Sequence, residues 1–263
     1  MGKDADLRES NDMKNAGLTQ PLAAARAASM LDNELSALKL RVHVSSDMQA
    51  FDVAKQAARG MEVAPMHHFA TGVFNRERAF WMYLTDDTGE IVGLQAFRYD
   101  EVDTHLADWC LNYMIGVYMR RQELMVPSFP KPPEGSAAER LTGKLVYHGE
   151  IWISKTVKNR KVFEIFVRLG LILAVIKWRP DAIWGLASAQ MAGHGHFTRV
   201  GYTILERGFL RWQWASDGID PVEYLVAAEL HSLEAMIDEM LATEAGSALV
   251  PAQKRSEPVS DSH

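Results

Sequence analysis

The pattern of apolar and polar residues changes twice between residues 143 and 187. Residues 143–154 read as a strand, the segment from Val162 to Trp178 is apolar at almost every position, and residues 182–187 form a second short apolar run. A short apolar run indicates a strand, whereas a long one indicates a buried helix. Two strands joined through a helix of that length predict a parallel β–α–β crossover.

The N-terminal half predicts helices and a β-hairpin. Ser46 or Asp47 can cap a helix, because either side chain accepts hydrogen bonds from the first free N–H groups. The turn residues from Asp86 to Gly89 separate two β-prone runs and predict a hairpin. In chain order, we expect a helix over 22–40, a strand over 41–44, a helix over 48–61 and hairpin strands over 78–84 and 91–99.

The later segments are less regular. Residues 100–140 form an irregular insertion, and its proline-rich stretch 126–135 predicts a loop that continues no regular element. Residues 203–214 predict two closing strands. Pro221 suits the first turn of a helix, which we expect to run to about Thr243.

The two ends of the chain are polar and lack periodicity, which predicts disordered tails over 1–20 and 244–263. We therefore expect a single domain over 21–243. Its fold class is α/β of the α+β type.

Composition limits the classes of function. Among 263 residues, 48% are apolar and 24% charged, which is ordinary for a globular protein. The net charge of -6 argues against a protein that binds nucleic acid as a whole. We expect no membrane span, because Glu164, Arg168 and Lys177 interrupt the most apolar segment. A single cysteine, Cys110, excludes an intrachain disulfide and fits a cytoplasmic location.

The order of the elements over residues 41–215 resembles that of the GNAT (Gcn5-related) N-acyltransferase family, and Gly201 and Tyr202 occupy the position of a Gly-Phe pair in that family. The resemblance implies a mixed sheet of six or seven strands flanked by helices. The helices expected over 22–40 and 221–243 are additions at the two ends of that domain.

The resemblance also implies a donor site. In the family, the fourth and fifth strands part, and the pantetheine arm of an acyl-CoA lies between them. Here the fourth strand would present Ile151, Ile153 and Ser154 to the donor. The diphosphate would then lie at the start of the following helix, whose free N–H groups and dipole attract anions.

The diphosphate loop departs from the family pattern, because residues 155–161 contain no glycine. Basic side chains could hold phosphate instead, although an ordinary solvated helix start has the same composition. A phosphopantetheine carried by an acyl carrier protein, in place of CoA, would need no diphosphate cradle. The residues expected at the phosphate are Lys155, Lys158, Asn159, Arg160 and Lys161.

Candidate catalytic residues follow from the same resemblance. Glu150 lies on the presumed fourth strand, where family members often place a general base, and His148 two residues earlier would share its face of the strand. The family tyrosine that protonates the leaving thiolate falls at Phe197, which has no proton to give. His196 could replace it. An ordinary polar pair on an exposed strand is the alternative for His148 and Glu150.

Two functions remain open. The first is transfer of an acyl group from acyl-CoA or an acyl carrier protein to a small-molecule amine. The second is a catalytically degenerate GNAT-like protein that binds or scaffolds, with its amphipathic helices in a homo-oligomer interface. We expect no metal, because the pairs His67–His68 and His194–His196 lack a cysteine cluster or an HExxH pattern.

Overall fold

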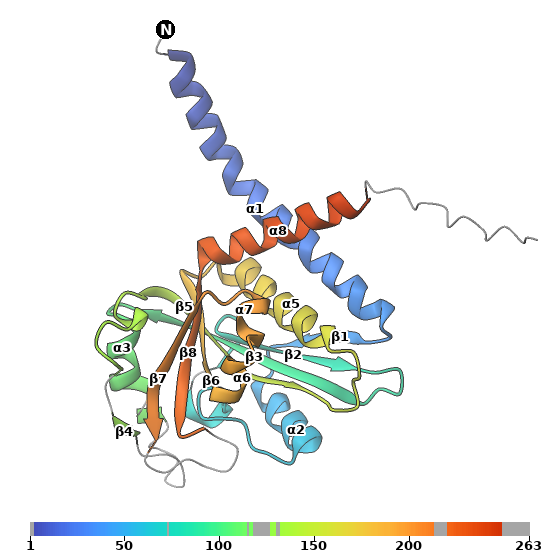
Figure 1. The fold of residues 1–263 in the computed structure, drawn as a ribbon, viewed down its shortest axis with the longest axis vertical. Coiled ribbons are helices and arrows are strands. Elements are labelled where there is room, and N and C mark those ends of the chain that lie inside the picture. Colours follow the sequence, from blue (N-terminus) through green and yellow to red (C-terminus); the bar gives the residue numbers. More distant parts are fainter. Residues whose placement is uncertain are drawn as a thin grey trace, which may run out of the picture.

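The computed structural model describes residues 3–72, 74–114, 116–117, 127–129, 132–212 and 220–248. They form one mixed sheet with helices on both faces (Figure 1). The strands are β1 (Arg41–Ser45), β2 (Ala79–Thr85), β3 (Ile91–Val102), β4 (Pro127–Phe129), β5 (Gly143–Ile153), β6 (Ala182–Ala187), β7 (Ile204–Trp212) and β8 (Val222–Glu229). The α-helices are α1 (Lys3–Ala37), α2 (Met48–Arg59), α3 (Leu106–Trp109), α5 (Lys161–Trp178), α6 (Ala189–Gly193), α7 (His196–Val200) and α8 (Leu230–Ala248).

The strand order is β1-β2-β3-β5-β6-β8-β7-β4. Among the described strands, β5 and β6 are parallel and every other neighbouring pair is antiparallel. The expected parallel crossover through a long apolar helix is therefore confirmed. The expected mixed sheet is confirmed as well, with seven longer strands and the three-residue β4 added at one edge.

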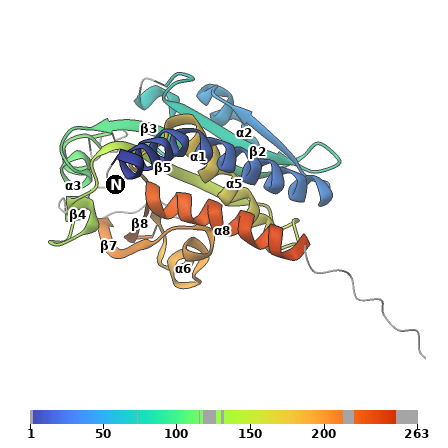
Figure 2. The same cartoon turned by 90° about the horizontal axis from the view of Figure 1, so that it is seen from above.

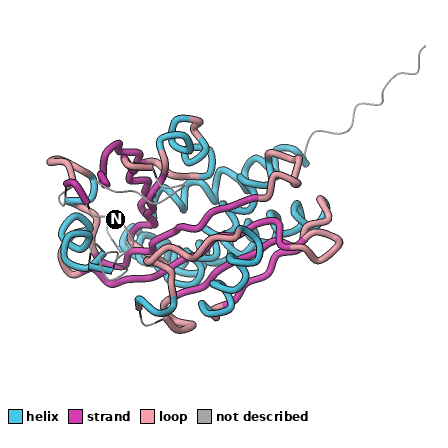
Figure 3. Tube along the Cα trace, turned by 90° about the horizontal axis from the view of Figure 1, so that it is seen from below, coloured by secondary structure: helices cyan, strands magenta, loops and turns pink. Residues whose placement is uncertain are grey.

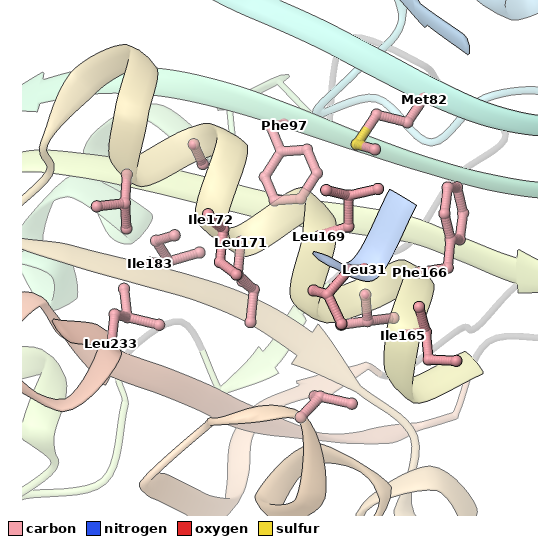
Figure 4. Close-up of a cluster of buried hydrophobic side chains, with 14 of the residues drawn as sticks. Leu31, Met82, Phe97, Ile165, Phe166, Leu169, Leu171, Ile172, Ile183 and Leu233 are labelled. Atoms are coloured by element: carbon pink, nitrogen blue, oxygen red, sulfur yellow. The ribbon is translucent and has the colours of Figure 1, made fainter. Parts of the chain in front are cut away.

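Helix α5 lies at the centre of the largest apolar cluster (Figure 4). Phe166, Leu171 and Ile172 of this helix are fully buried against Phe97 of β3 and Ile183 of β6. Helix α5 is apolar on nearly all sides because the sheet covers one side of it and other helices cover the opposite side. In the described part of the chain, no helix combines the length and the apolar character that crossing a bilayer requires.

Helices α1 and α8 cross over the outer surface of α5 (Figure 2). Leu31 and Leu35 of α1, together with Leu233 of α8, complete the same apolar cluster. The boundary expected for the first helix was wrong, because α1 is helical from Lys3 and continues through Pro21. Polar residues with good helix propensity can extend a helix without an apolar face, so the period of apolar residues does not report them.

The segment expected as a helix from Pro221 to Thr243 was also wrong in its first part. It begins with strand β8, which lies in the sheet between β6 and β7, and α8 starts only at Leu230. Hydrogen bonding of β8 to β6 on one edge and to β7 on the other overrides the weak helical pattern of residues 222–229. Residues 204–212 form one strand, and β8 is its partner in place of a second strand within 203–214.

The described residues of the expected insertion over 100–140 contain regular elements; residues 115, 118–126 and 130–131 lie outside the described part of the chain. Strand β3 continues to Val102, and α3 with a π-helical turn over Cys110–Met114 follows it. The loop expected over 126–135 was wrong at Pro127–Phe129, where β4 pairs with β7 at the edge of the sheet. An edge strand tolerates proline because one of its edges has no neighbouring strand, so the missing N–H costs no hydrogen bond when it faces that edge.

The face of the sheet opposite α5 has its own apolar clusters. Figure 3 shows the strands of the sheet from below, in magenta. Helix α2 covers β2 and β3 there, with Asp47 as its N-cap. Aromatic residues from β5, β6 and β7, among them Tyr147, Trp184 and Phe209, lie beside α3 on the same face. We refer to this side of the sheet as the α2 face and to the other as the α5 face.

Candidate functional site

Strands β5 and β6 pair over a short distance and then separate. Their last parallel pair joins Tyr147 to Trp184. A Cβ atom on Gly185 would lie 2.5 Å from the carbonyl oxygen of His148, so the strands approach closely at this point. From Gly149 to Ile153, β5 has no partner in β6 and becomes half-buried at every residue. Backbone groups at this edge are therefore available to a ligand.

A β-bulge lies at the point of separation. Leu94 of β3 pairs with Trp152 and Ala96 pairs with Gly149, so Gln95 opposes two residues of β5. Glu150, one of these two, has φ of +59°, a conformation that costs free energy for a residue with a side chain. Bulges are frequent beside active sites because they redirect the side chains that follow.

The bulge directs Glu150 to the α2 face. Its carboxylate contacts the Lys55 Nζ atom at 2.5 Å and accepts a hydrogen bond from the backbone N–H of Ala64. Both side chains of the ion pair are almost entirely buried, with 5% and 6% of their surface exposed. Lys55 also donates to the carbonyl of Glu62 at 2.7 Å. The ion pair therefore ties helix α2 and the segment after it to the bulge.

His148 lies on the α5 face, where its ring stacks on Phe97 at a centroid distance of 4.2 Å. The expectation that His148 and Glu150 share one face of the strand was wrong, because the bulge breaks the alternation of side chains between them. Burial lowers the pKa of His148 to about 3. Its imidazole is therefore neutral at ordinary pH.

Both ring nitrogens of His148 take part in a buried chain of hydrogen bonds. Nε2 donates to Gln95 Oε1 at 3.0 Å, and Nδ1 accepts from the Tyr202 hydroxyl at 2.7 Å. This tautomer follows from Gln95, whose amide nitrogen donates to the Phe166 carbonyl at 2.7 Å. A Cβ atom on Gly170 would lie 2.7 Å from the Gln95 amide, so the glycine provides the space for it.

The loop between β5 and α5 lies beside the separated strands. Ser154 accepts hydrogen bonds from the N–H groups of Thr156 and Val157, and Asn159 Oδ1 accepts from the N–H of Lys161 at the helix start. Several backbone N–H groups of the loop are therefore bonded within the loop itself, whereas a glycine-rich phosphate loop leaves such groups free for the ligand. A surface pocket of about 250 Å³ lies beside it, lined by Lys158 and Asn159 among others.

The basic residues of this loop form an exposed group at the N-terminus of α5. Among the described residues, none of the four has an acidic partner. The helix start adds the positive end of its dipole to their charge. The members of this group, which we call the basic loop, are Lys155, Lys158, Arg160 and Lys161.

His196 begins helix α7 and contacts the first turn of α5. Its ring meets that of Phe163 edge to face, and Arg199 donates to its Nδ1 at 2.9 Å. Partial burial and, to a smaller extent, the charge of Arg199 lower the pKa of His196. Phe197, at the position of the family tyrosine, is buried against Tyr202.

The remaining histidines do not assemble into a metal site. Within the described residues, no group of three or more His, Cys, Asp or Glu side chains could hold a metal ion. His67 is fully buried beside Tyr147. Burial, followed by the charge of Arg98, lowers its pKa well below the ordinary value. His68 instead lies 3.1 Å from the carboxylate of Asp52.

Glu223 of β8 is an acid with a shifted pKa that the sequence did not indicate. Its carboxylate accepts a hydrogen bond of 2.6 Å from the indole N–H of Trp212. Burial raises the pKa of Glu223 to about 7, although the bond from Trp212 opposes the shift. The sequence pattern missed it because Glu223 falls in the segment expected as a helix. An acid two residues after Pro221 carries no signal of its own there.

Taken together, the strand order and the separation of β5 from β6 define a GNAT-like fold. No protein-family model and no curated protein matches the chain. Arabidopsis thaliana NAA60 in complex with acetyl-CoA is similar in fold, at 13% identity and a TM-score of 0.44, with 73% of this chain and 99% of that chain covered.

Two further solved structures are similar to the same degree. The acetyltransferase of the GNAT family from Streptococcus pneumoniae has 10% identity and a TM-score of 0.43, covering 72% of this chain and 99% of its own. FeeM, an N-acyl amino acid synthase from uncultured soil microbes, has 14% identity and a TM-score of 0.41, with 74% and 93% covered. Identities this low describe a likeness of fold and nothing finer.

Proposed function

We propose that the protein transfers an acyl group from a pantetheine thioester to an amine. The observation that carries this proposal is the opening between β5 and β6. The half-buried edge from Gly149 to Ile153 runs from the bulge directly into the basic loop. A pantetheine arm has amides that can pair with such a strand edge, and its phosphate end would reach the positive helix start.

The donor is either a CoA thioester or an acyl carrier protein. The acetyl-CoA complex of NAA60 favours CoA. The absence of glycine between residues 155 and 161 favours a donor that needs no tight diphosphate cradle. The exposed basic loop fits either a nucleotide phosphate or an acidic carrier surface. The chemistry common to both is phosphopantetheine, which we assign to this opening.

The contacts of Glu150 and His148 support positioning roles for these two residues. Glu150 already binds the Lys55 cation, and His148 uses both ring nitrogens within the core. A proton acceptor needs a free lone pair within reach of the substrate. We propose that Glu150 holds the bulge open and that His148 fixes β5 against β3 and α5. His196, which begins α7 and contacts the first turn of α5, remains our candidate for protonating the leaving thiolate.

A binding function without catalysis is the second candidate. One feature that favours it is Phe197, which has no hydroxyl group at the position of the family tyrosine. The other is the loop after β5, where backbone N–H groups already donate to side chains of the same loop. In this case the opening would hold a phosphopantetheine group without turning it over. Phe197 and the internally bonded loop would then reflect the loss of catalysis.

Turnover distinguishes the two candidates. The purified protein is incubated with acetyl-CoA, a long-chain acyl-CoA or an acylated carrier protein, together with a mixture of small amines. Mass spectrometry then detects the amide product and the free thiol. We expect stoichiometric formation of both from at least one donor. Donor binding without any amide would support the binding function, and no binding of any donor would exclude both candidates.

A further inference from the structure

The position of Glu223 in the sheet places it at the opening between β5 and β6. Tyr224 pairs with Ala187, the last residue of β6, so Glu223 lies one residue beyond the end of that strand. On its other side Glu223 pairs with Leu210 of β7. One edge of β8 at Glu223 therefore faces the region where β5 has already left β6.

Alternation along β8 places the Glu223 side chain on the α2 face. Leu225 and Ala227, two and four residues later, belong to the aromatic cluster of that face together with Trp184 and Tyr147. Side chains two apart on a regular strand share a face. Glu223 and the half-buried Gly149 edge of β5 therefore border the opening on the same side.

The described residues offer Glu223 no counter-ion. Among the described residues, no Lys, Arg or His lies within ion-pair distance of its carboxylate, whose bonded partner is the neutral indole of Trp212. The like charge of Asp220 acts on it and contributes to raising its pKa. Asp220 is itself occupied, since its two oxygens accept from the N–H groups of Ala189 and Val222.

A half-buried carboxylate beside a second acid and without a cation is costly for stability. Groups of this kind cluster at functional sites, because the same environment tunes them for proton transfer. Trp212 donates to one oxygen, Oε2, and none of the described residues is found donating to Oε1. Glu150, in contrast, has both carboxylate oxygens engaged.

We propose that Glu223 is the catalytic residue that accepts the proton of the acceptor amine, which enters from the α2 face; this rests on the acyl-transfer function proposed above. The ammonium group gives one proton to the Glu223 carboxylate. The free amine then attacks the thioester carbonyl carbon, an N–C bond forms, and the C–S bond breaks. The sulfur leaves as a thiolate, and the second proton of the nitrogen reaches it through His196, our candidate for protonating the thiolate. Glu223 returns its proton to water.

The pH dependence follows from the same groups. A pKa of about 7 means that the carboxylate is half protonated near neutral pH, so activity falls as the pH drops through this value. The titratable group whose charge acts on Glu223 is Asp220, just before the start of β8, and the partner from β7 is the non-titrating Trp212.

The test compares Glu223→Gln with Glu229→Gln, which makes the same change at the opposite, closed end of β8. Glu229 lies at the surface, 3.9 Å from Arg140. We expect Glu223→Gln to lower kcat/KM at pH 7.5 by about 10²–10⁴-fold and to remove the acid limb of its pH profile, as loss of a general base does. Donor affinity in calorimetry should stay unchanged, and Glu229→Gln should behave as the wild type.

A second measurement does not depend on turnover. The indole N–H of Trp212, assigned with Trp212→Phe, is followed by NMR as the pH is varied. Its resonance should titrate near pH 7 in the wild type and lose this transition in Glu223→Gln. Active Glu223→Gln protein with an intact acid limb would overturn the assignment, as would an indole resonance that does not titrate near neutral pH. If the wild type binds a donor but acylates no amine, the proposed function fails and the role of Glu223 fails with it, whatever the indole shows.

Discussion

Replacing Lys55 with methionine should destabilise the protein by about 3–5 kcal/mol, because it leaves the Glu150 carboxylate buried without its cation. The ion pair is short and enclosed, with a distance of 2.5 Å and exposures of 5% and 6%. Methionine is unbranched like lysine and only one atom shorter, so lost packing adds little. For a chain of this size, the change corresponds to a fall in melting temperature of about 10 °C.

The structure offers a matched control for this measurement. Arg76 and Glu77 also form an ion pair, at 3.1 Å, but their side chains are 85% and 73% exposed. Water screens such a pair, so Arg76→Met should cost about 0–1 kcal/mol. Both variants remove one positive charge, and a difference in stability between them therefore measures burial.

Differential scanning calorimetry of both variants and of the double variant Lys55→Met/Glu150→Gln completes the test. The double variant should recover a large part of the loss, because no unpaired charge remains. A Lys55→Met protein that melts together with Arg76→Met would refute the reasoning. So would a double variant that is less stable than Lys55→Met alone.

Three further outcomes are expected. Phe166→Asp should give insoluble or unfolded protein, judged by circular dichroism, because it buries an unpaired charge in the centre of α5; a soluble protein that melts cooperatively would contradict its placement. Gly170→Ala should destabilise the protein by about 1–3 kcal/mol in urea unfolding, since the new methyl group displaces the Gln95 amide; a stabilising effect, as expected for alanine in an open helix, would be inconsistent with this contact. The free energy of unfolding should fall as the pH drops from about 6.5 toward 3, because His148 is protonated in the unfolded chain but not in the folded protein. In unfolding experiments at a series of pH values, His148→Gln should flatten this slope. An unchanged slope would show that His148 is not the group responsible.

Much of the sheet could be predicted because its signals are local. The turn at Asp86–Gly89 predicts the hairpin of β2 and β3, and the apolar run from Val162 to Trp178 predicts α5 between two parallel strands. Both follow from residue types within a single window. Strand β8 could not be predicted in this way, since its neighbours β6 and β7 determine its conformation.

The candidate site depends on features without a local signal. A glutamate at φ of +59° has no sequence signature, and without the bulge an alternating strand places Glu150 beside His148. Lys55 reaches Glu150 from a helix far earlier in the chain, so its role is visible only in three dimensions. The basic loop could be predicted, because its four cations lie within seven consecutive residues at a helix start.

Hydrogen–deuterium exchange of the backbone, with and without a donor, tests the central claim most directly. Acetyl-CoA and acylated carrier protein are each added to the wild type and to the double variant Lys158→Glu/Arg160→Glu. A pantetheine arm between β5 and β6 should slow exchange in Gly149–Ile153 and in the basic loop of the wild type. The double variant should need a higher donor concentration for the same protection. Donor binding that leaves Gly149–Ile153 unprotected, or that the double variant retains in full, would contradict the account.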